Sequence, residues 1–547
     1  MLTIYINHIL RDTVHIRDRW STLNQMIKLK TISILVIPIL WISACQETDQ
    51  KEIIDLKELT ITKIHKAYSK GSYNSQDLIS AYIAAIWEAN DEINALTVIN
   101  PNALKTAQAL DEEYQKTKVL RPLHGIPIIV KDNINTTGLP TTAGSFALQD
   151  YFPEKNAFVI NKLVEAGAII LAKSNMAEWA FSPMHSESST GGTTYNPYNL
   201  DYVPAGSSGG TASAIAANLA VGGLGTDTGN SIRGPSSHNS LVGFRTTLGL
   251  ISREGIVPLF LRNDVVGPMC RNVEDATRIM EVMVGVDSKD PITVNALNKT
   301  SKNYRQYLVK NGLLGARIGI LRELSESEID PDIKVLFEKA ISDLDSLGAE
   351  IIDPVVIPNF AILRQNQWCA CFRTDVETFL ATYVKRDTVK TLEDIIRIGT
   401  TSEFAKERLL ESTSASGRWG DSDAECFDAY HDANRITFRE AIEAVMDSLK
   451  LDAIVYPTWN NKPARIDHFQ EEYKGDNSQV IAPHTGQPAF TVPMGFSPGN
   501  LPSGLQFLGR MYDEPTLIKL TYSYEQGTKH RKPPILNEKA ITKDKMH

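Results

Sequence analysis

The sequence lacks the patterns that would assign it to several large classes of protein. Its five cysteines include no C-x-x-C pair and no cluster with histidine at the spacing of a zinc site. Lysine and arginine together number 56 against 65 acidic residues, and no basic stripe is interleaved with aromatic residues, which argues against a nucleic-acid partner. There is also no low-complexity tract, internal repeat or clear linker. With 42% apolar and 22% charged residues, the composition is that of an ordinary globular protein.

The four cysteines after position 45 give no clear disulfide pattern. Cys369 and Cys371 are two positions apart, too close to pair readily in a helix or a strand, and Cys270 and Cys426 lie far away in sequence. We therefore expect mostly free, buried thiols, and the spacing alone leaves a disulfide open.

The N-terminal region contains a candidate export signal. A short basic segment at residues 26–30 precedes an apolar run at residues 31–42, which is too short to span a membrane comfortably. The run ends in Ile-Ser-Ala-Cys at Cys45. Small residues before a cysteine resemble a bacterial lipobox, in which Cys45 would be lipidated and become the mature N-terminus. An ordinary signal peptide or an uncleaved anchor is the alternative interpretation.

The chain is expected to form one large domain behind this signal. Residues 1–25 are polar and charged and would be unusual ahead of a signal peptide, so Met26 is the expected start. The predicted parts are an extension and signal peptide at 1–45, a tether at 46–54, one domain at 55–535 and a tail at 536–547. Within the domain, the region from about 359 to 450 is richer in charge, tryptophan and helical patterning, and we expect a helical insertion that determines specificity.

Apolar spacing predicts alternating helices and strands from about residue 53 onward. Helical spacing occurs at 56–89, 157–166, 212–220, 273–284 and 332–347. Short runs typical of strands occur at 127–130, 168–172, 317–321, 453–456, 489–492 and 505–509. This order indicates an α/β fold with a mixed central sheet.

The most informative segment runs from Pro204 to Gly234 and contains eight glycines. Glycine loses more freedom on folding than any other residue, so such a segment usually means that the backbone passes very close to something or points several N–H groups at one anion. Ser207 and Ser231 lie 24 positions apart in this segment, and Lys131 ends an apolar run upstream. One lysine and two serines around a glycine-rich anion site suggest acyl transfer without a histidine.

Hydrolysis of an amide needs a nucleophile, a base, a stabilised oxyanion and a proton for the leaving amine. Lysine can act as a base only when neutral, and burial after the apolar residues 128–130 would lower the pKa of Lys131. A second serine could relay the proton between nucleophile and lysine. Successive backbone N–H groups at 227–231 could surround the nucleophile, each typically worth about 2.7–4 kcal/mol in the transition state.

These segments resemble the amidase signature family. GIPIIVKDNI, PAGSSGG and GTDTGNSIRGPSSHNSLVGFRTTLG match its lysine, first serine and nucleophile segments in order and spacing, and the similarity extends over roughly residues 59–534. The resemblance implies a single large α/β domain with a mixed central β-sheet covered by helices. It also implies an enzyme that hydrolyses linear carboxamides through an acyl-enzyme, with no metal or organic cofactor.

The resemblance also assigns roles by position. Ser231 resembles the nucleophile, Ser207 the bridging serine that follows a cis peptide bond, and Lys131 the base at the end of the relay. The oxyanion hole would consist of the backbone N–H groups of Ser231 and the three residues before it, Thr228, Gly229 and Asn230.

Asn230 departs from the pattern, because the family usually has glycine at this position. Asparagine tolerates a positive φ better than most residues, so we expect the loop still to form. Its side chain would intrude near the acyl pocket or donate an extra hydrogen bond, which affects the substrate range more than the activity.

Residues 206–210 also match G-x-S-x-G, the nucleophile elbow of α/β-hydrolases. That interpretation makes Ser208 the nucleophile, with an acid and a histidine downstream. It leaves Lys131 and Ser231 unexplained, and the pattern is short enough to be common by chance.

Polar residues near Ser231 allow further alternatives. His238 could serve as its base, although a histidine so close in sequence is more often structural. Asp227 and Arg233 could act as electrostatic catalysts, but hydrogen bonds that hold the loop are the more frequent role.

Together these features predict a lipid-tethered amidase of the bacterial cell envelope. We expect a small-molecule or peptide amide as substrate, a monomer or homodimer, no nucleic-acid partner, and membrane contact only through the lipid anchor. One alternative is the A-type subunit of a tRNA amidotransferase, but an exported enzyme has no access to aminoacyl-tRNA. Another is a non-catalytic amide- or peptide-binding lipoprotein in which Asn230 blocks turnover. Peptide, aryl and fatty-acid amides all remain open as substrates.

Overall fold

The computed structural model describes residues 54–536, apart from residues 327, 370 and 415–425. The predicted signal peptide with Cys45, most of the tether and nearly all of the C-terminal tail lie outside the described residues. In the described part, no helix is both long and apolar enough to cross a membrane.

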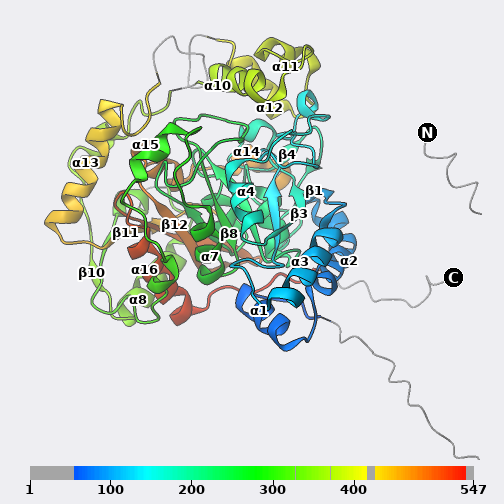
Figure 1. Cartoon of the computed structure of the whole chain (residues 1–547). Helices are drawn as coiled ribbons and strands as arrows, with labels where there is room; N and C mark the ends of the chain where they lie inside the picture. Colours follow the sequence, from blue (N-terminus) through cyan, green and yellow to red (C-terminus); the bar gives the residue numbers. More distant parts are fainter. Residues whose placement is uncertain (1–53, 327, 370, 415–425, 537–547) are drawn as a thin grey trace, which may run out of the picture. The chain divides into compact units, whose positions relative to one another are not determined.

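A mixed sheet of eleven strands forms the centre of the domain (Figure 1). Its strands are β1 (Leu96–Ile99), β2 (Pro127–Lys131), β3 (Ile169–Ser174), β6 (Gly222–Asp227), β7 (Val242–Arg245), β8 (Val265–Cys270), β9 (Arg317–Ile320), β10 (Glu350–Ile352), β11 (Ala453–Pro457), β12 (Ala489–Ser497) and β13 (Leu501–Leu508). Their spatial order is β1-β3-β2-β6-β8-β7-β12-β13-β11-β9-β10. A separate pair consists of β4 (Glu187–Ser188) and β5 (Gly192–Thr193). The expected α/β fold with a mixed central sheet is confirmed.

Helices of varied length surround the sheet. They are α1 (Ile61–Lys70), α2 (Ser75–Ile93), α3 (Ala103–Thr117), α4 (Phe158–Glu165), α5 (Gly209–Ala216), α6 (Arg233–His238), α7 (Val273–Met283), α8 (Pro331–Ser346), α9 (Phe360–Leu363), α10 (Phe372–Phe379), α11 (Leu392–Ile398), α12 (Glu403–Glu411), α13 (Ala433–Ser448), α14 (Phe469–Glu472), α15 (Ala482–Thr485) and α16 (Glu514–Thr528). A π-helical turn at Leu380–Val384 continues α10.

The direction of the strands decides where polar side chains gather. β2 runs parallel to β3 and β6, whereas β8, the next strand in the sheet, runs antiparallel to β6. The carboxyl ends of β2 and β6 therefore meet at one edge, beside the point where the strand direction reverses. In open α/β sheets, ligand sites usually form outside the carboxyl ends of the strands. Lys131 ends β2 and Asp227 ends β6 at that edge.

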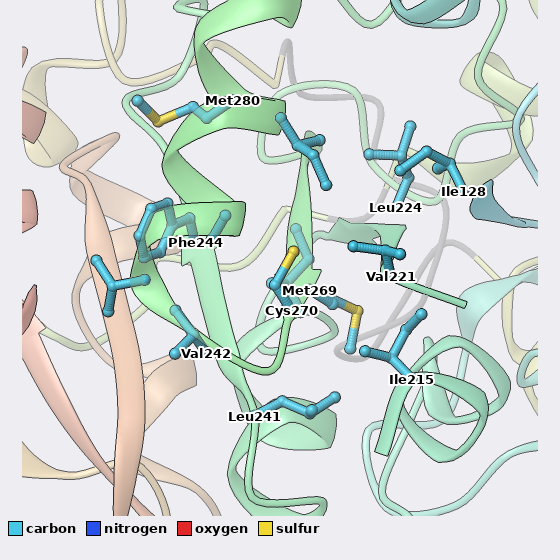
Figure 2. Packing of buried hydrophobic residues seen from close by; sticks show 14 of the residues in the cluster. Ile128, Ile215, Val221, Leu224, Leu241, Val242, Phe244, Met269, Cys270 and Met280 are labelled. Carbon is cyan, nitrogen blue, oxygen red and sulfur yellow. The ribbon is translucent and has the colours of Figure 1, made fainter. Parts of the chain in front are cut away.

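β6 carries the glycines that let helices approach both faces of the sheet. A Cβ atom on Gly222 would lie 2.5 Å from Ile279 of α7, and one on Gly223 would lie 2.5 Å from Thr211 of α5. Because successive strand residues point to opposite faces, each glycine makes room for a different helix. Figure 2 shows the result, with Met280 of α7 and Ile215 of α5 on the two sides of the buried strands.

Among the described residues between 359 and 450 are the helices α9 to α13 and the π-helical turn, and α10, α11 and α12 lie together at the top of Figure 1. A disulfide joins Cys369 to Cys426 in this region, so the expectation of mostly free thiols is wrong for these two residues. Cys270 is a buried thiol and Cys371 a half-buried one. The spacing of Cys369 from Cys371 was uninformative because the partner of Cys369 comes from a segment 57 residues away.

Candidate active site

Lys131 is completely buried at the carboxyl end of β2. Its Nζ lies 2.7 Å from Ser207 Oγ and 2.9 Å from Thr226 Oγ1. Burial disfavours the charged ammonium and lowers the pKa of Lys131 to about 7, although the carboxyl groups of Asp264 and Asp227 act in the opposite direction. A large fraction of the lysine is therefore neutral near pH 7, as a proton acceptor must be.

Ser207 lies in the tight loop before α5, after a cis peptide bond with Gly206. A Cβ on Gly206 would lie 2.3 Å from the carbonyl oxygen of His185, and one on Gly210 would lie 2.3 Å from that of Asn175. Only glycine fits at these close approaches. The glycines of the first serine motif thus press the loop against neighbouring backbone and bring Ser207 to Lys131.

Ser231 lies in the loop between β6 and α6, at one wall of a cleft. Within the described part of the chain, the backbone N–H groups of residues 228–231 have no hydrogen-bond acceptor, whereas that of Ile232 donates to Asp227 Oδ2 at 3.2 Å. Neighbouring N–H groups without acceptors beside a serine are what an oxyanion hole requires.

The hydroxyl of Ser231 does not complete the expected chain of hydrogen bonds in this conformation. Among the described residues, Ser231 Oγ donates to Asn230 Oδ1 at 3.3 Å, and it makes no hydrogen bond with Ser207. The structure thus brings Lys131 and Ser207 together, whereas the Ser231 hydroxyl is directed to Asn230. Asn230 has no positive φ, so the loop does not need the conformational tolerance expected for this residue.

A buried ionic cluster holds the loop that carries Ser231. Arg233 Nε and Arg245 Nη1 lie 3.1 Å and 2.8 Å from the carboxylate of Asp227, and all three side chains are fully buried. Burial alone would raise the pKa of the Asp227 carboxyl, but the two guanidinium groups lower it to about 2. Arg233 Nη2 also donates to the carbonyl of Gly229 at 2.7 Å. The contacts of Asp227 and Arg233 are therefore those of residues that hold the loop.

Asp264 supports the first residue of the loop. Its Oδ1 accepts a hydrogen bond from Thr228 Oγ1 at 2.5 Å, and its Oδ2 accepts one from the backbone of Leu259 at 3.0 Å. Burial raises the pKa of the Asp264 carboxyl to about 6, against the lowering effect of these hydrogen bonds.

The cleft beside Ser231 has a volume of about 360 Å³ and a mainly apolar wall. Its large apolar and aromatic lining residues are Phe181, Met184, Leu259, Trp368, Phe404 and Tyr473. They come from the helical region at 359–450 as well as from the loops near the sheet. Among the described residues, no cluster of three or more histidine, cysteine, aspartate or glutamate side chains is placed to hold a metal ion.

Two alternative catalytic residues occupy unsuitable positions. Ser208 is fully buried, and its hydroxyl donates to the carbonyl of Thr226 at 3.3 Å, away from the cleft lining. His238 is buried against Trp459, with 4.5 Å between the ring centroids, and burial lowers its pKa to about 3. A base with so low a pKa is a poor proton acceptor at neutral pH.

A model of the Amidase family matches residues 77–518. The chain belongs to the amidase signature family. It is therefore an enzyme that hydrolyses carbon–nitrogen bonds. This amidase is 34% identical over 501 residues to a probable amidase of Arabidopsis thaliana. The match covers 88% of this chain and 92% of that protein. It is 33% identical over 498 residues to the A subunit of a glutamyl-tRNA(Gln) amidotransferase from Thermoanaerobacter pseudethanolicus, with 88% and 99% of the chains covered.

A solved structure agrees with this assignment. The native peptide amidase of Stenotrophomonas maltophilia is similar to this amidase with a TM-score of 0.76 and 34% sequence identity, and the match covers 88% of this chain and 99% of that one.

Sequence reasoning missed several residues of the amidase site. Thr226 Oγ1 accepts hydrogen bonds from Lys131 and, at 3.0 Å, from Asn133 Nδ2, so it helps to position the lysine. Thr226 directly precedes Asp227 in the nucleophile motif, and this position could have indicated that it belongs to the site. The tryptophan content of residues 359–450 pointed to that region, but not to Trp368 itself, because its place in the cleft depends on packing between distant segments.

Proposed function

We propose that this amidase hydrolyses a linear carboxamide through an acyl-enzyme on Ser231, with Ser207 and Lys131 moving the proton. The observation that carries the proposal is the 2.7 Å contact between Lys131 Nζ and Ser207 Oγ, made where burial lowers the pKa of the lysine to about 7. Both groups are buried beside the loop that carries Ser231, so the proton can move without passing through bulk water.

In the proposed reaction, Ser231 Oγ bonds to the carbonyl carbon while its proton passes to Ser207 and the Ser207 proton passes to neutral Lys131. The backbone N–H groups of residues 228–231 stabilise the resulting oxyanion. When the carbon–nitrogen bond breaks, the proton returns along the same path to the leaving nitrogen, and ammonia or an amine departs. Water then attacks the acyl-enzyme by the same route, which releases the carboxylate and restores Ser231.

The cleft supports a substrate with an apolar or aromatic group close to its carboxamide. Phe181, Trp368 and Tyr473 line it, and aromatic walls bind apolar groups by excluding water. The similarity to a peptide amidase favours C-terminal peptide amides within this class. N-acetyl-L-phenylalaninamide is therefore a suitable first substrate.

Ammonia release from this substrate tests the proposal directly. We expect Ser231→Ala to abolish turnover and Lys131→Ala to reduce it to a small residual rate. Ser207→Ala should reduce turnover severely without abolishing it. Ser208→Ala is the matched control, because Ser208 lies one residue from Ser207 and outside the cleft. Near-normal rates from Lys131→Ala would contradict the relay.

Labelling with a fluorophosphonate separates an enzyme from a binding protein. We expect covalent modification of the wild type at Ser231 and none of Ser231→Ala. A wild type that binds the amide but is neither labelled nor active would favour the non-catalytic alternative. Copurification with partner proteins from the cytosol would instead favour a component of an amidotransferase.

We further propose that the enzyme is exported and tethered by a lipid on Cys45. The disulfide between Cys369 and Cys426 supports this, because such bonds persist mainly in oxidising compartments. Radioactive palmitate should label the wild type in bacterial cells and should not label Cys45→Ala. Equal labelling of the two proteins would contradict the lipid anchor.

A further inference from the structure

The side chain of Asn230 connects the proposed nucleophile to Pro183, another residue of the cleft lining. Its Oδ1 accepts the hydrogen bond from Ser231 Oγ at 3.3 Å, and its Nδ2 donates to the carbonyl oxygen of Pro183 at 3.4 Å. Since a carbonyl oxygen can only accept, the amide nitrogen must face Pro183 and the amide oxygen must face Ser231. Asn230 therefore presents an acceptor beside the reacting serine.

The surroundings of Asn230 maintain this orientation. A Cβ on Gly234 would lie 2.6 Å from Asn230 Nδ2, so a larger residue at position 234 would displace the asparagine side chain. Asn230 is only 2% exposed, although it contributes to the lining of the cleft. A side chain with so little freedom can discriminate between ligands by hydrogen bonding.

The proposed chemistry requires Ser231 to leave this acceptor. Its hydroxyl must turn toward Ser207 to give up the proton, and Asn230 Oδ1 then loses its hydrogen bond. A buried acceptor without a donor is costly, so turnover is favoured when the substrate supplies a new donor. A carboxamide can do this through an N–H group, whereas an ester has no hydrogen on its leaving oxygen.

The leaving nitrogen of the substrate is placed to replace the Ser231 hydroxyl as the donor to Asn230 Oδ1. In the tetrahedral intermediate, the nitrogen and Ser231 Oγ are bonded to the same carbon, so the nitrogen can occupy the side of that carbon that faces Asn230 Oδ1. We infer that Asn230 Oδ1 accepts an N–H of the scissile amide and makes Asn230 a specificity-determining residue for amides over esters. This inference rests on the proposed function, because it uses Ser231 as the nucleophile.

The test compares two substrates that differ only in the leaving group, N-acetyl-L-phenylalaninamide and N-acetyl-L-phenylalanine methyl ester. Titration with a fluorophosphonate gives the concentration of active enzyme for each variant. We expect Asn230→Ala to lower the ratio of kcat/KM for the amide to kcat/KM for the ester by about tenfold relative to the wild type, with the loss mainly in kcat for the amide. Asn230→Gly, which has the residue usual in the family, should do the same.

Met184→Ala provides the matched control. Met184 also lines the cleft, but it offers no hydrogen bond to a leaving group. Its replacement should change the amide and ester rates by a common factor and leave their ratio as in the wild type.

An amide-to-ester ratio within twofold of the wild-type value in both Asn230 variants would overturn the inference. Loss of amide and ester turnover in equal measure would also overturn it, because Asn230 would then act on the nucleophile alone. The proposed function fails separately if Ser231→Ala hydrolyses the amide as fast as the wild type.

Discussion

Lys131 Nζ and Ser207 Oγ lie 2.7 Å apart, and neither side chain is exposed to solvent. The two residues are separated by 76 positions in the chain and meet because β2 and the loop before α5 end at the same edge of the sheet. Burial favours the neutral amine, and the contact gives that amine one defined proton donor.

The pH dependence of kcat/KM should follow the ionisation of Lys131. Because the neutral amine is the base and its pKa is lowered to about 7, kcat/KM should rise with pH through about 7 and level off above it. A lysine with its ordinary pKa of 10.5 would give a rise about three and a half units higher. The pH profile of ammonia release measures this, and a rise centred near pH 10 would contradict the assignment.

Replacing Lys131 should stabilise the folded protein at low pH, although it removes the base that the reaction needs. Its pKa is lower in the folded state than in the unfolded state, so the folded protein binds fewer protons between about pH 7 and pH 10.5. The destabilisation caused by burying the ammonium is therefore complete below pH 7 and disappears as the pH rises toward 10.5. Lys131→Met should be more stable than the wild type at pH 6, and urea unfolding should show this difference shrink by pH 9.5. A difference that stays constant with pH would contradict the lowered pKa.

Thr226 should tune the same ionisation. Its Oγ1 accepts a hydrogen bond from Lys131 Nζ at 2.9 Å, and an acceptor stabilises the charged ammonium more than the neutral amine. Thr226→Val keeps the shape but removes the acceptor, so the rise of kcat/KM should move to lower pH and the plateau should fall as the lysine loses its orientation. Thr226→Ser retains the hydroxyl and is the control. An unchanged pH profile in Thr226→Val would show that the contact has no influence on the base.

Asp227 should matter for stability more than an exposed aspartate does. Asp227→Asn leaves Arg233 and Arg245 buried without their carboxylate, and breaking a buried ion pair in this way costs about 3–5 kcal/mol. Asp467→Asn removes an exposed carboxylate that pairs with Arg465, and it should leave the unfolding midpoint unchanged. Chemical denaturation of both variants measures the contrast, and equal midpoints would show that the cluster does not hold the loop.

The sequence predicted the residues that carry a local signature. Lys131, Ser207 and Ser231 stand in motifs where glycines and an apolar strand reveal an unusual local backbone, and the structure brings the first two into contact. Strands such as β2 and β11 were predictable from their β-branched residues. β6 was not, because the sequence Gly-Gly-Leu-Gly-Thr-Asp has few side chains of the kind that favour strands. Its glycines are explained only by the helices on both faces.

Features that depend on distant segments could not be predicted. The sequence led us to expect the Asn230 side chain near the pocket or in an extra hydrogen bond, but not its partners, which are the carbonyl of Pro183 and the Ser231 hydroxyl. It likewise pointed to residues 359–450 but not to Trp368, which meets the loop at Gly229 from 139 positions away. The expectation that Asn230 would need a positive φ came from the family pattern, and the actual constraint on its side chain is the space left by Gly234.

The disulfide should control how well the cleft binds substrate. Cys369 is bonded to Cys426, and the adjacent Trp368 lines the cleft, where its ring lies 3.1 Å from the position of a Cβ on Gly229. Releasing the bond lets this wall move, so replacing both cysteines by serine should raise KM by roughly threefold to tenfold, which corresponds to the loss of an aromatic contact of about 0.5–1.5 kcal/mol. The value of kcat should change little, because Lys131 and Ser207 do not touch this segment.

Reduction of the wild type should reproduce the effect of the double replacement. Cys371→Ser is the control, since Cys371 is a half-buried thiol that donates to Asp375 and takes no part in the disulfide. This variant should keep the wild-type KM and should still respond to a reducing agent. If KM stays constant after thiol titration shows that the bond is broken, then Trp368 is held by other contacts, such as its packing against His484 with 4.7 Å between the ring centroids, and not by the disulfide.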